Sequence, residues 1–211
     1  MGTRNLTCVV LDGKYKVAQY GQWDGYPASA GVTVYEFLKK MMEITHNGAP
    51  ANYLLRFYEN LRKCRFISDD ELQKLWVECG ATPGSDTVGM DVADKFKGVH
   101  PTLSRDTGAG ILNVIFDTES HVAYIPLTNA IEFANEGLFC EWVYLLDLDT
   151  HRLKVYRGQH EEPHLASGRF PGQVLLWDCV FADLPSKPEN FVAHLDALAD
   201  KSRKAKKKVA K

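Results

Sequence analysis

The chain has 211 residues, of which 45% are hydrophobic and 25% are charged. This composition is typical of a globular protein that is long enough to bury one sizeable core. No apolar run is long enough to cross a bilayer, which excludes a membrane-spanning protein and predicts that no membrane is a partner.

Five cysteines are scattered along the chain and form no C-x-x-C pair. Such cysteines are typical of buried thiols in a reducing compartment. The N-terminal residues do not have the pattern of a secretory signal. We therefore expect a cytoplasmic protein.

The net charge of −2 hides an asymmetry along the chain. Residues 201–211 hold seven Lys and Arg and no acid, which leaves 18 basic against 27 acidic residues over 1–200. The sequence predicts one α+β domain over 1–200 and a basic, disordered tail over 201–211, where a frayed helix end keeps its lysines in solvent. The alternative is that the tail touches nucleic acid or a membrane surface. The acidic body disfavours nucleic acid as a partner.

A β-hairpin opens the chain. Asp12-Gly13 is the dipeptide of a two-residue type I′ turn, and β-forming residues flank it on both sides. Regular alternation from this turn predicts Cys8 opposite Val17 and Leu6 opposite Gln19. One face of the hairpin then carries an apolar set of residues: Leu6, Cys8, Val10, Tyr15 and Val17.

Polar side chains gather at the open end of this hairpin, away from the turn. A cation, a carboxylate and several amides beside aromatic rings form the set that a small-ligand pocket requires. We predict catalytic roles for Asp24, as a general acid or base, and for Arg4. The alternative is structural, with Arg4 paired to Asp24 and the amides satisfying the backbone of an irregular turn. The predicted binding residues of this segment are Asn5, Gln19, Tyr20, Gln22 and Tyr26.

Three helices are predicted after the hairpin, which indicates a helical layer over a sheet. A capping box at Thr33–Glu36 begins the first helix, and Asn47-Gly48 ends it. Pro50 fits the first turn of the second helix. A capping box at Ser68–Glu71 begins the third, which ends at Gly80. The residues of the second helix that are predicted to face inward are Leu54, Leu55, Tyr58 and Leu61.

The stretch from Gly80 to Pro101 is the least regular part of the sequence and indicates either a lid or an insertion. Within it, a short helix is predicted over Val88–Phe96. Ser104 is then the predicted N-cap of a helix that buries Ile111, Leu112, Ile115 and Phe116. Arg105 and Asp106 are predicted binding residues, because a helix N-terminus beside an arginine suits an anion. Gly108 and Gly110 indicate a close approach to the backbone, by another element or by a ligand, and match no Walker or dinucleotide motif.

A second hairpin is predicted from Phe139 to Arg157. Both faces of its first strand are apolar, so we expect this strand at the centre of the sheet, covered on both sides. Glu141 is a predicted binding residue that needs a partner, for which Arg4 or Arg105 is available. Such a pair would be either structural or catalytic.

A group of ionisable residues lies in the turn of the second hairpin and in the segment just after it. The spacing of its members matches no zinc motif, so we predict no metal and no cofactor. These residues are His151, His160, His164, Glu161 and Glu162.

Four stretches carry a resemblance to a known family. Met1–Leu6, Val17–Pro27, Leu103–Ala109 and Leu138–Asp149 resemble an uncharacterised family of proteins from phages, bacteria and filamentous fungi. The resemblance covers most of the chain up to about Gly158. It implies no particular activity.

The start of the chain is also similar to that of N-terminal nucleophile hydrolases such as the choloylglycine hydrolases. In those enzymes a terminal Cys, Ser or Thr is the nucleophile and its own α-amine is the base. Removal of Met1 would expose Gly2, which has no side-chain nucleophile. This likeness therefore implies the fold without its usual chemistry.

The order of elements predicts an α+β fold with a largely antiparallel sheet and helical layers. The specific architecture that we favour is the four-layer αββα form of the N-terminal nucleophile hydrolases. Three functions follow as hypotheses: a hydrolase of amide bonds that lacks the usual nucleophile, a non-catalytic protein that sequesters a small anionic or nucleotide-derived ligand, and a structural or interaction protein. The sequence gives no indication of an oligomeric state.

Overall fold

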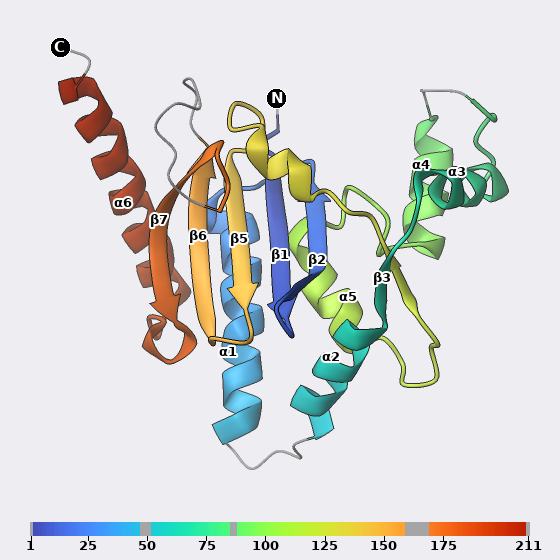
Figure 1. Cartoon of the computed structure of the whole chain (residues 1–211), viewed down its shortest axis with the longest axis horizontal. Coiled ribbons are helices and arrows are strands. Elements are labelled where there is room, and N and C mark those ends of the chain that lie inside the picture. Colours follow the sequence, from blue (N-terminus) through green and yellow to red (C-terminus); the bar gives the residue numbers. More distant parts are fainter. Residues whose placement is uncertain (1, 47–51, 85–87, 159–168, 210–211) are drawn as a thin grey trace.

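A computed structural model of the chain describes residues 2–46, 52–84, 88–158 and 169–209. It is an α+β protein, as the sequence predicted. Its main sheet has five strands (Figure 1). The strand order is β2-β1-β5-β6-β7, and every neighbouring pair is antiparallel except β1 and β5. The strands are β1 (Asn5–Leu11), β2 (Lys14–Gly21), β5 (Trp142–Asp147), β6 (Arg152–Gly158) and β7 (Gln173–Val180).

The second sheet of the described residues is small. It pairs β3 (Cys64–Phe66) with β4 (Ile125–Leu127) in parallel and lies beside the β2 edge of the main sheet (Figure 1). Just after β4, the amide of Ala130 donates to the carbonyl of Ala18 on β2. The described residues therefore do not show the two stacked sheets of the favoured four-layer architecture.

The first hairpin forms at the predicted turn, but its predicted register is wrong. Asp12 and Gly13 have φ of 55° and 68°, as a type I′ turn requires. A β-bulge between Val9 and Val10 then shifts the pairing, so that Val9 lies opposite Val17. Because one extra residue flips all side chains beyond it, Val17 lies on the face opposite the one predicted.

Both faces of the central strands are buried, which confirms that β5 is covered on two sides. One face packs against helices in the larger core, which includes Val9, Val17 and Tyr144. The other packs against residues 130–140 and Phe170. The apolar residues of β1 and β5 on this second face are Leu6, Cys8, Val10, Val143 and Leu145.

The helical layer behind the sheet consists of α1 (Val32–His46), α5 (Ile111–Asp117) and α6 (Pro188–Val209) (Figure 1). The predicted capping box at Thr33 is wrong, because a π-helical segment, Pro27–Gly31, already precedes α1. The Thr33 hydroxyl donates to the carbonyl of Ser29 inside this continuous helix. The inward residues predicted for α5 are all buried: Ile111, Leu112, Ile115 and Phe116.

Helix α2 (Asn52–Lys63) packs beside α5. Of its predicted inward residues, Leu61 is buried, Tyr58 is partly buried, and Leu55 is 52% exposed, which contradicts its prediction. Phe57, rather than Leu55, is fully buried. The predicted helix end at Asn47-Gly48 and Pro50 lie outside the described residues.

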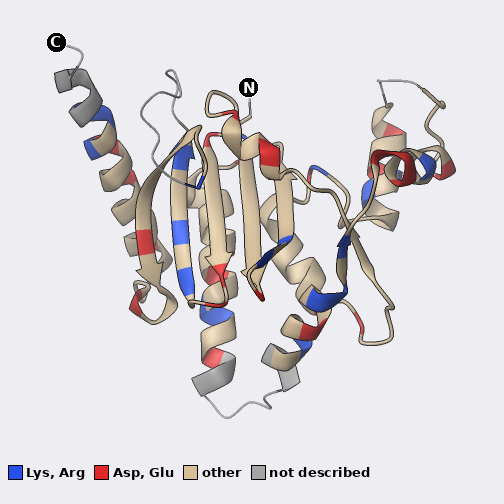
Figure 2. Cartoon of the chain, viewed as in Figure 1, with Lys and Arg blue, Asp and Glu red and all other residues tan. Residues whose placement is uncertain are grey.

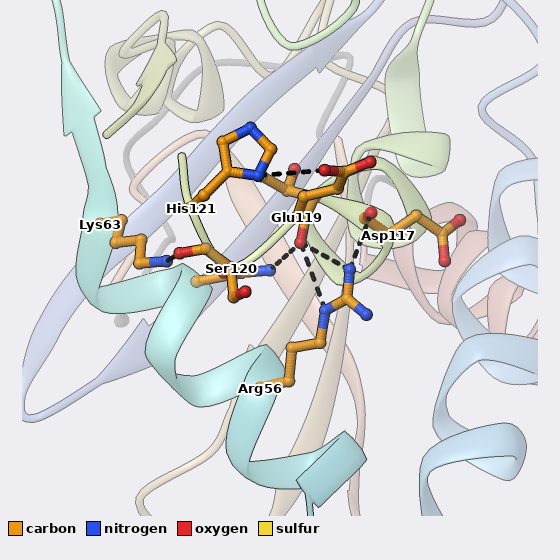
Figure 3. Close-up of polar contacts among 8 residues, drawn as sticks. Arg56, Lys63, Asp117, Glu119, Ser120 and His121 are labelled. Carbon is orange, nitrogen blue, oxygen red and sulfur yellow. Dashed lines mark hydrogen bonds and ion pairs between the residues drawn. The ribbon is translucent and has the colours of Figure 1, made fainter. Parts of the chain in front are cut away.

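Polar side chains of α2 hold the C-terminal end of α5 (Figure 3). The Arg56 guanidinium donates to the carbonyls of Asp117 and Thr118, and the Lys63 ammonium donates to the carbonyl of Ser120. Asn60 donates to the carbonyls of residues 115 and 118. Carbonyls at a helix C-terminus lack intrahelical donors and carry partial negative charge, so these contacts fix the end of α5.

A helix is present within the stretch from Gly80 to Pro101, as the sequence predicted, but it begins at Met90 rather than Val88. Helices α3 (Asp69–Glu78) and α4 (Met90–Val99) pack together away from the main sheet, with Trp76 and Phe96 stacked at 3.6 Å between ring centroids (Figure 1). The predicted capping box of Ser68 is confirmed by both of its hydrogen bonds. This pair of helices has a small core of its own.

Among the described residues, three short 3₁₀ segments accompany these helices and strands: Gly108–Gly110, Ile131–Asn135 and Phe181–Asp183. Helix α6 runs to Val209 and so includes most of the basic segment 201–211. The sequence predicted a disordered tail there. All five cysteines are free and four are buried. None of the helices in the described ranges has the length and apolar character that crossing a bilayer would require.

Figure 2 shows Lys and Arg spaced along β6. Neighbouring strands supply acids to two of them. Arg152 lies 2.6 Å from a carboxylate oxygen of Asp178 on β7, and Lys154 lies 3.6 Å from one of Asp147 on β5. This row of cations is thus largely neutralised within the sheet.

Candidate functional site

A polar pocket of about 200 Å³ lies at the open end of the first hairpin. Its walls come from the end of β2, from the turn before α1 and from residues 105–110. The structure thus brings together the polar turn after the first hairpin and the segment around Arg105, which the sequence pointed to separately. The predicted site residues among its lining are Asn5, Gln22, Asp24, Arg105 and Asp106.

Asn5 is the buried polar residue of this pocket, with no solvent exposure. Its Nδ2 donates to the carbonyls of Gly21 and Trp23 at 3.4 and 3.3 Å. Two carbonyls on one side fix the orientation of the amide, since the oxygen would be repelled there. The Oδ1 atom is buried and accepts no hydrogen bond from the described residues.

Two glycines make room for this asparagine. A Cβ atom on Gly21 would lie 2.6 Å from Asn5 Nδ2. A Cβ on Gly25 would lie 2.8 Å from Asn5 Cβ and 2.9 Å from the carbonyl oxygen of Thr3. All three distances are shorter than real Cβ contacts, so close approach explains these two glycines of the Gly21–Pro27 turn.

Asp24 is held in a strained turn. Its φ is 50°, in the left-handed region that Asn and Asp tolerate better than most residues. The Tyr26 hydroxyl donates to Asp24 Oδ1 at 2.9 Å, and this hydrogen bond to a carboxylate raises the pKa of Tyr26. The next carbonyl, that of Gly25, accepts from the buried Tyr144 hydroxyl at 2.9 Å. Strand β5 therefore holds this turn through the Tyr144 hydroxyl.

The Arg105 segment is docked on the end of β2. Gln19 Nε2 donates to the backbone carbonyl of Ser104 at 2.9 Å. The backbone amide of Gln22 donates to the backbone carbonyl of Arg105 at 3.2 Å. Ser104 is not the N-cap of α5, because a turn and the 3₁₀ segment intervene. Gly108 has φ of 47°, so this glycine serves a left-handed turn rather than a helix interior.

Trp23 lines the mouth of the pocket and was missed as a site residue. Its Nε1 donates to Asp106 Oδ1 at 3.2 Å, and 55% of the residue is exposed. A Cβ on Gly2 would lie 2.3 Å from Trp23 Cε3, so the Gly2 backbone packs against the six-membered ring of the indole. The sequence signal was an aromatic residue inside the polar turn. The structure adds that this ring is fixed and half-open.

Five predicted site residues do not line the pocket. Gln19 supports the Ser104 carbonyl, and Tyr26 reaches only Asp24. Tyr20 packs edge-on against Phe133 and its hydroxyl donates to Gln22 Oε1. The other two are Arg4 and Glu141.

Arg4 and Glu141 are placed differently from their prediction. The Arg4 guanidinium lies over the Phe139 ring, 5.2 Å from its centroid. Glu141 precedes β5, is partly exposed and bonds to Arg4 only through its backbone amide. Within the described ranges no ion pair joins Glu141 to Arg4 or Arg105, nor Arg4 to Asp24.

The pocket lining offers hydroxyls but no histidine or cysteine. Thr33 donates to the Ser29 carbonyl and Thr107 to the Pro101 carbonyl, so two of the three hydroxyls are engaged with the backbone. Elsewhere in the described ranges, no three His, Cys, Asp or Glu residues are close enough to bind a metal. Of the ionisable group in and just after the second hairpin, residues 160–164 lie outside those ranges.

Searches with this chain against family models, curated proteins and solved structures found no match. The resemblances to the phage, bacterial and fungal family and to the N-terminal nucleophile hydrolases therefore stay predictions.

Proposed function

We propose that the chain binds a small polar ligand in the pocket between Asn5, Asp24 and Arg105 without transforming it. The observation that carries this proposal is the unpartnered Oδ1 of Asn5, a fully buried residue in the pocket lining. Leaving a buried acceptor unsatisfied costs about 1–3 kcal/mol, and native proteins rarely do so without a functional reason. A ligand hydroxyl or amine would supply the missing donor.

The remaining lining defines the class of ligand. The Arg105 guanidinium in this lining suits an anionic group. The carboxylates of Asp24 and Asp106 suit sugar hydroxyls or amines, as acceptors only. The open face of the Trp23 indole suits a flat ring. A nucleotide-derived ligand combines these three features, with its ring outside the pocket because about 200 Å³ cannot enclose a whole nucleotide.

Hydrolysis of an amide is less well supported by this geometry. A hydroxyl nucleophile needs a base within hydrogen-bond reach, and the described lining contains no histidine. Asp24 is the candidate general acid or base, but its Oδ1 already accepts from Tyr26. Binding without turnover uses the same residues and requires no further group.

The test begins with mass spectrometry of the purified protein, under native and then denaturing conditions. A bound metabolite would appear as a mass that disappears on denaturation. Calorimetric titration with adenosine 5′-monophosphate and with inorganic phosphate follows. We expect the nucleotide to bind more tightly than phosphate, because only the nucleotide has the hydroxyls and the ring.

Arg105→Ala is the diagnostic variant, and Arg65→Ala is its matched control. Arg65 is an exposed arginine paired with Glu71, away from the pocket lining. Loss of a charge-assisted contact should weaken nucleotide binding about tenfold in Arg105→Ala and leave Arg65→Ala unchanged. No native adduct together with no binding of either probe would contradict the proposal and favour a structural role for the turn.

A further inference from the structure

A second cavity, of about 210 Å³, lies beside the middle of α1, whereas the polar pocket lies at its N-terminal end. Its lining comes from the middle of α1, from α2, from the β5–β6 turn and from the 3₁₀ segment after β7. Figure 1 shows where these elements lie relative to one another. Its lining is almost entirely apolar: Phe37, Leu38, Met41, Met42, Phe57, Tyr58, Leu148, His151 and Phe181.

The floor of this cavity belongs to the core, and its mouth is open to solvent. Phe37, Leu38 and Phe57 are at most 2% exposed, and Met41, Leu148 and Phe181 are also buried. Tyr58 and Met42 are partly exposed and His151 is exposed, so the cavity opens toward solvent on their side. The floor is therefore aromatic and aliphatic, and the polar atoms are confined to the mouth.

Protein interiors are close-packed, and voids larger than a water molecule are few. Atoms that line an empty void lose their dispersion contacts. An apolar void of this kind does not hold ordered water, because water needs two to four polar partners. In another protein, an engineered apolar cavity of about 150 Å³ stays dry and binds benzene. The present cavity is larger.

We infer that this cavity is a binding site for a small apolar molecule, the size of one substituted aromatic ring or a short acyl chain. The lining selects for this class because a polar or charged group placed against Phe37, Leu38 and Phe57 would lose its hydration without gaining a partner. Any polar end of the ligand must face the mouth, where the His151 imidazole and the Tyr58 hydroxyl are the available groups. The site is separate from the polar pocket and does not depend on the function proposed for it.

Methionine methyl groups give a direct readout of occupancy. Met41 and Met42 line the cavity, whereas Met90 is 82% exposed at the start of α4. Toluene is titrated into protein carrying ¹³C-methyl methionine, and methyl NMR spectra are recorded. We expect saturable shifts of Met41 and Met42, contacts from toluene protons to both methyl groups, and no shift of Met90.

A cavity-filling variant separates binding in the cavity from adsorption to the surface. Leu148→Trp places a larger side chain at the β5–β6 turn, and it should weaken toluene binding about tenfold or more while the protein stays folded. If Leu148→Trp does not fold, Met42→Trp takes its place. Three results would overturn the inference: no shift at Met41 and Met42, equal shifts at Met90, or unchanged toluene affinity in a folded cavity-filling variant.

Discussion

The two ends of the β1–β5 strand pair differ in whether their polar side chains have hydrogen-bond partners. Because these strands are parallel, both begin beside the polar pocket and both end at a tight turn. At the turn end, Asp149 after β5 accepts hydrogen bonds from the amides of Asp12 and Gly13, both at 2.8 Å. One oxygen bonds to each amide, so this carboxylate ties the two turns together.

At the pocket end, by contrast, polar atoms remain without partners. The oxygens of the Asn5 and Gln19 side-chain amides are both buried and accept nothing from the described residues. Aspartates and amides near turns look alike in the sequence. Asp149 has both oxygens satisfied and serves the fold, whereas Asn5 has a free oxygen and lines the pocket, which is why a ligand is proposed as its partner.

The largest expected effect comes from crowding the pocket end. Gly25→Ala would press a methyl group against Asn5 Cβ and the Thr3 carbonyl, so we expect a loss of about 2–3 kcal/mol in the free energy of unfolding. Urea denaturation measures it. Gly98→Ala is the control, because a Cβ there meets nothing within 4 Å and the site is inside α4. The control should be neutral or slightly stabilising. Equal behaviour of the two variants would show that the packing around Asn5 is loose.

Asp149→Ala tests the turn end. It removes the acceptor of two charge-assisted hydrogen bonds, and because the site is exposed we expect a loss of only about 1 kcal/mol in stability. Asp149→Asn keeps one acceptor oxygen and should lose less. Thermal or urea unfolding that leaves both variants as stable as the parent would contradict the assigned role.

Asp147 makes the turn end sensitive to acid. Burial raises its pKa, but hydrogen bonds from Thr150 and the charge of Lys154 outweigh burial, and its pKa lies below the ordinary value of 3.8. A lowered pKa contributes stability that is complete above about pH 4 and is lost as the pH falls through the folded-state pKa. Asp147→Asn should therefore cost about 1 kcal/mol at pH 7 and progressively less below pH 4. A difference that stays constant down to pH 2 would rule out this linkage.

The smallest effect on stability is expected at the pocket rim. Arg105→Ala and Asp24→Asn should each change the free energy of unfolding by no more than about 0.5 kcal/mol, because both residues are exposed. Asparagine is chosen at position 24 because it tolerates the positive φ better than alanine would. Both variants should nevertheless lose ligand affinity in the calorimetric titration. A large loss of stability would instead assign this rim to the fold.

Local signals could be predicted well from the sequence. The Asp12-Gly13 turn, the Ser68 capping box and the buried stripe of α5 depend on residues within a few positions of one another. The wrong predictions depend on more than the local pattern of residues. Thr33 has the residues of a capping box, but the chain is already helical from Pro27. Leu55 fits an inward position by spacing, yet Phe57 is the residue that packs against Phe37 and Phe116.

By itself, the sequence determined the fold class, the two hairpins and the two polar segments that now line one pocket. Only the tertiary structure decided that β1 pairs in parallel with β5, that a bulge reverses the face of Val17, and that Trp23 is fixed at the pocket mouth. It also decided that α1, α2 and the β5–β6 turn enclose an apolar cavity. The physical reason is range: turns and caps follow from neighbouring residues, whereas strand order, register and cavities depend on contacts between residues that are far apart in the chain.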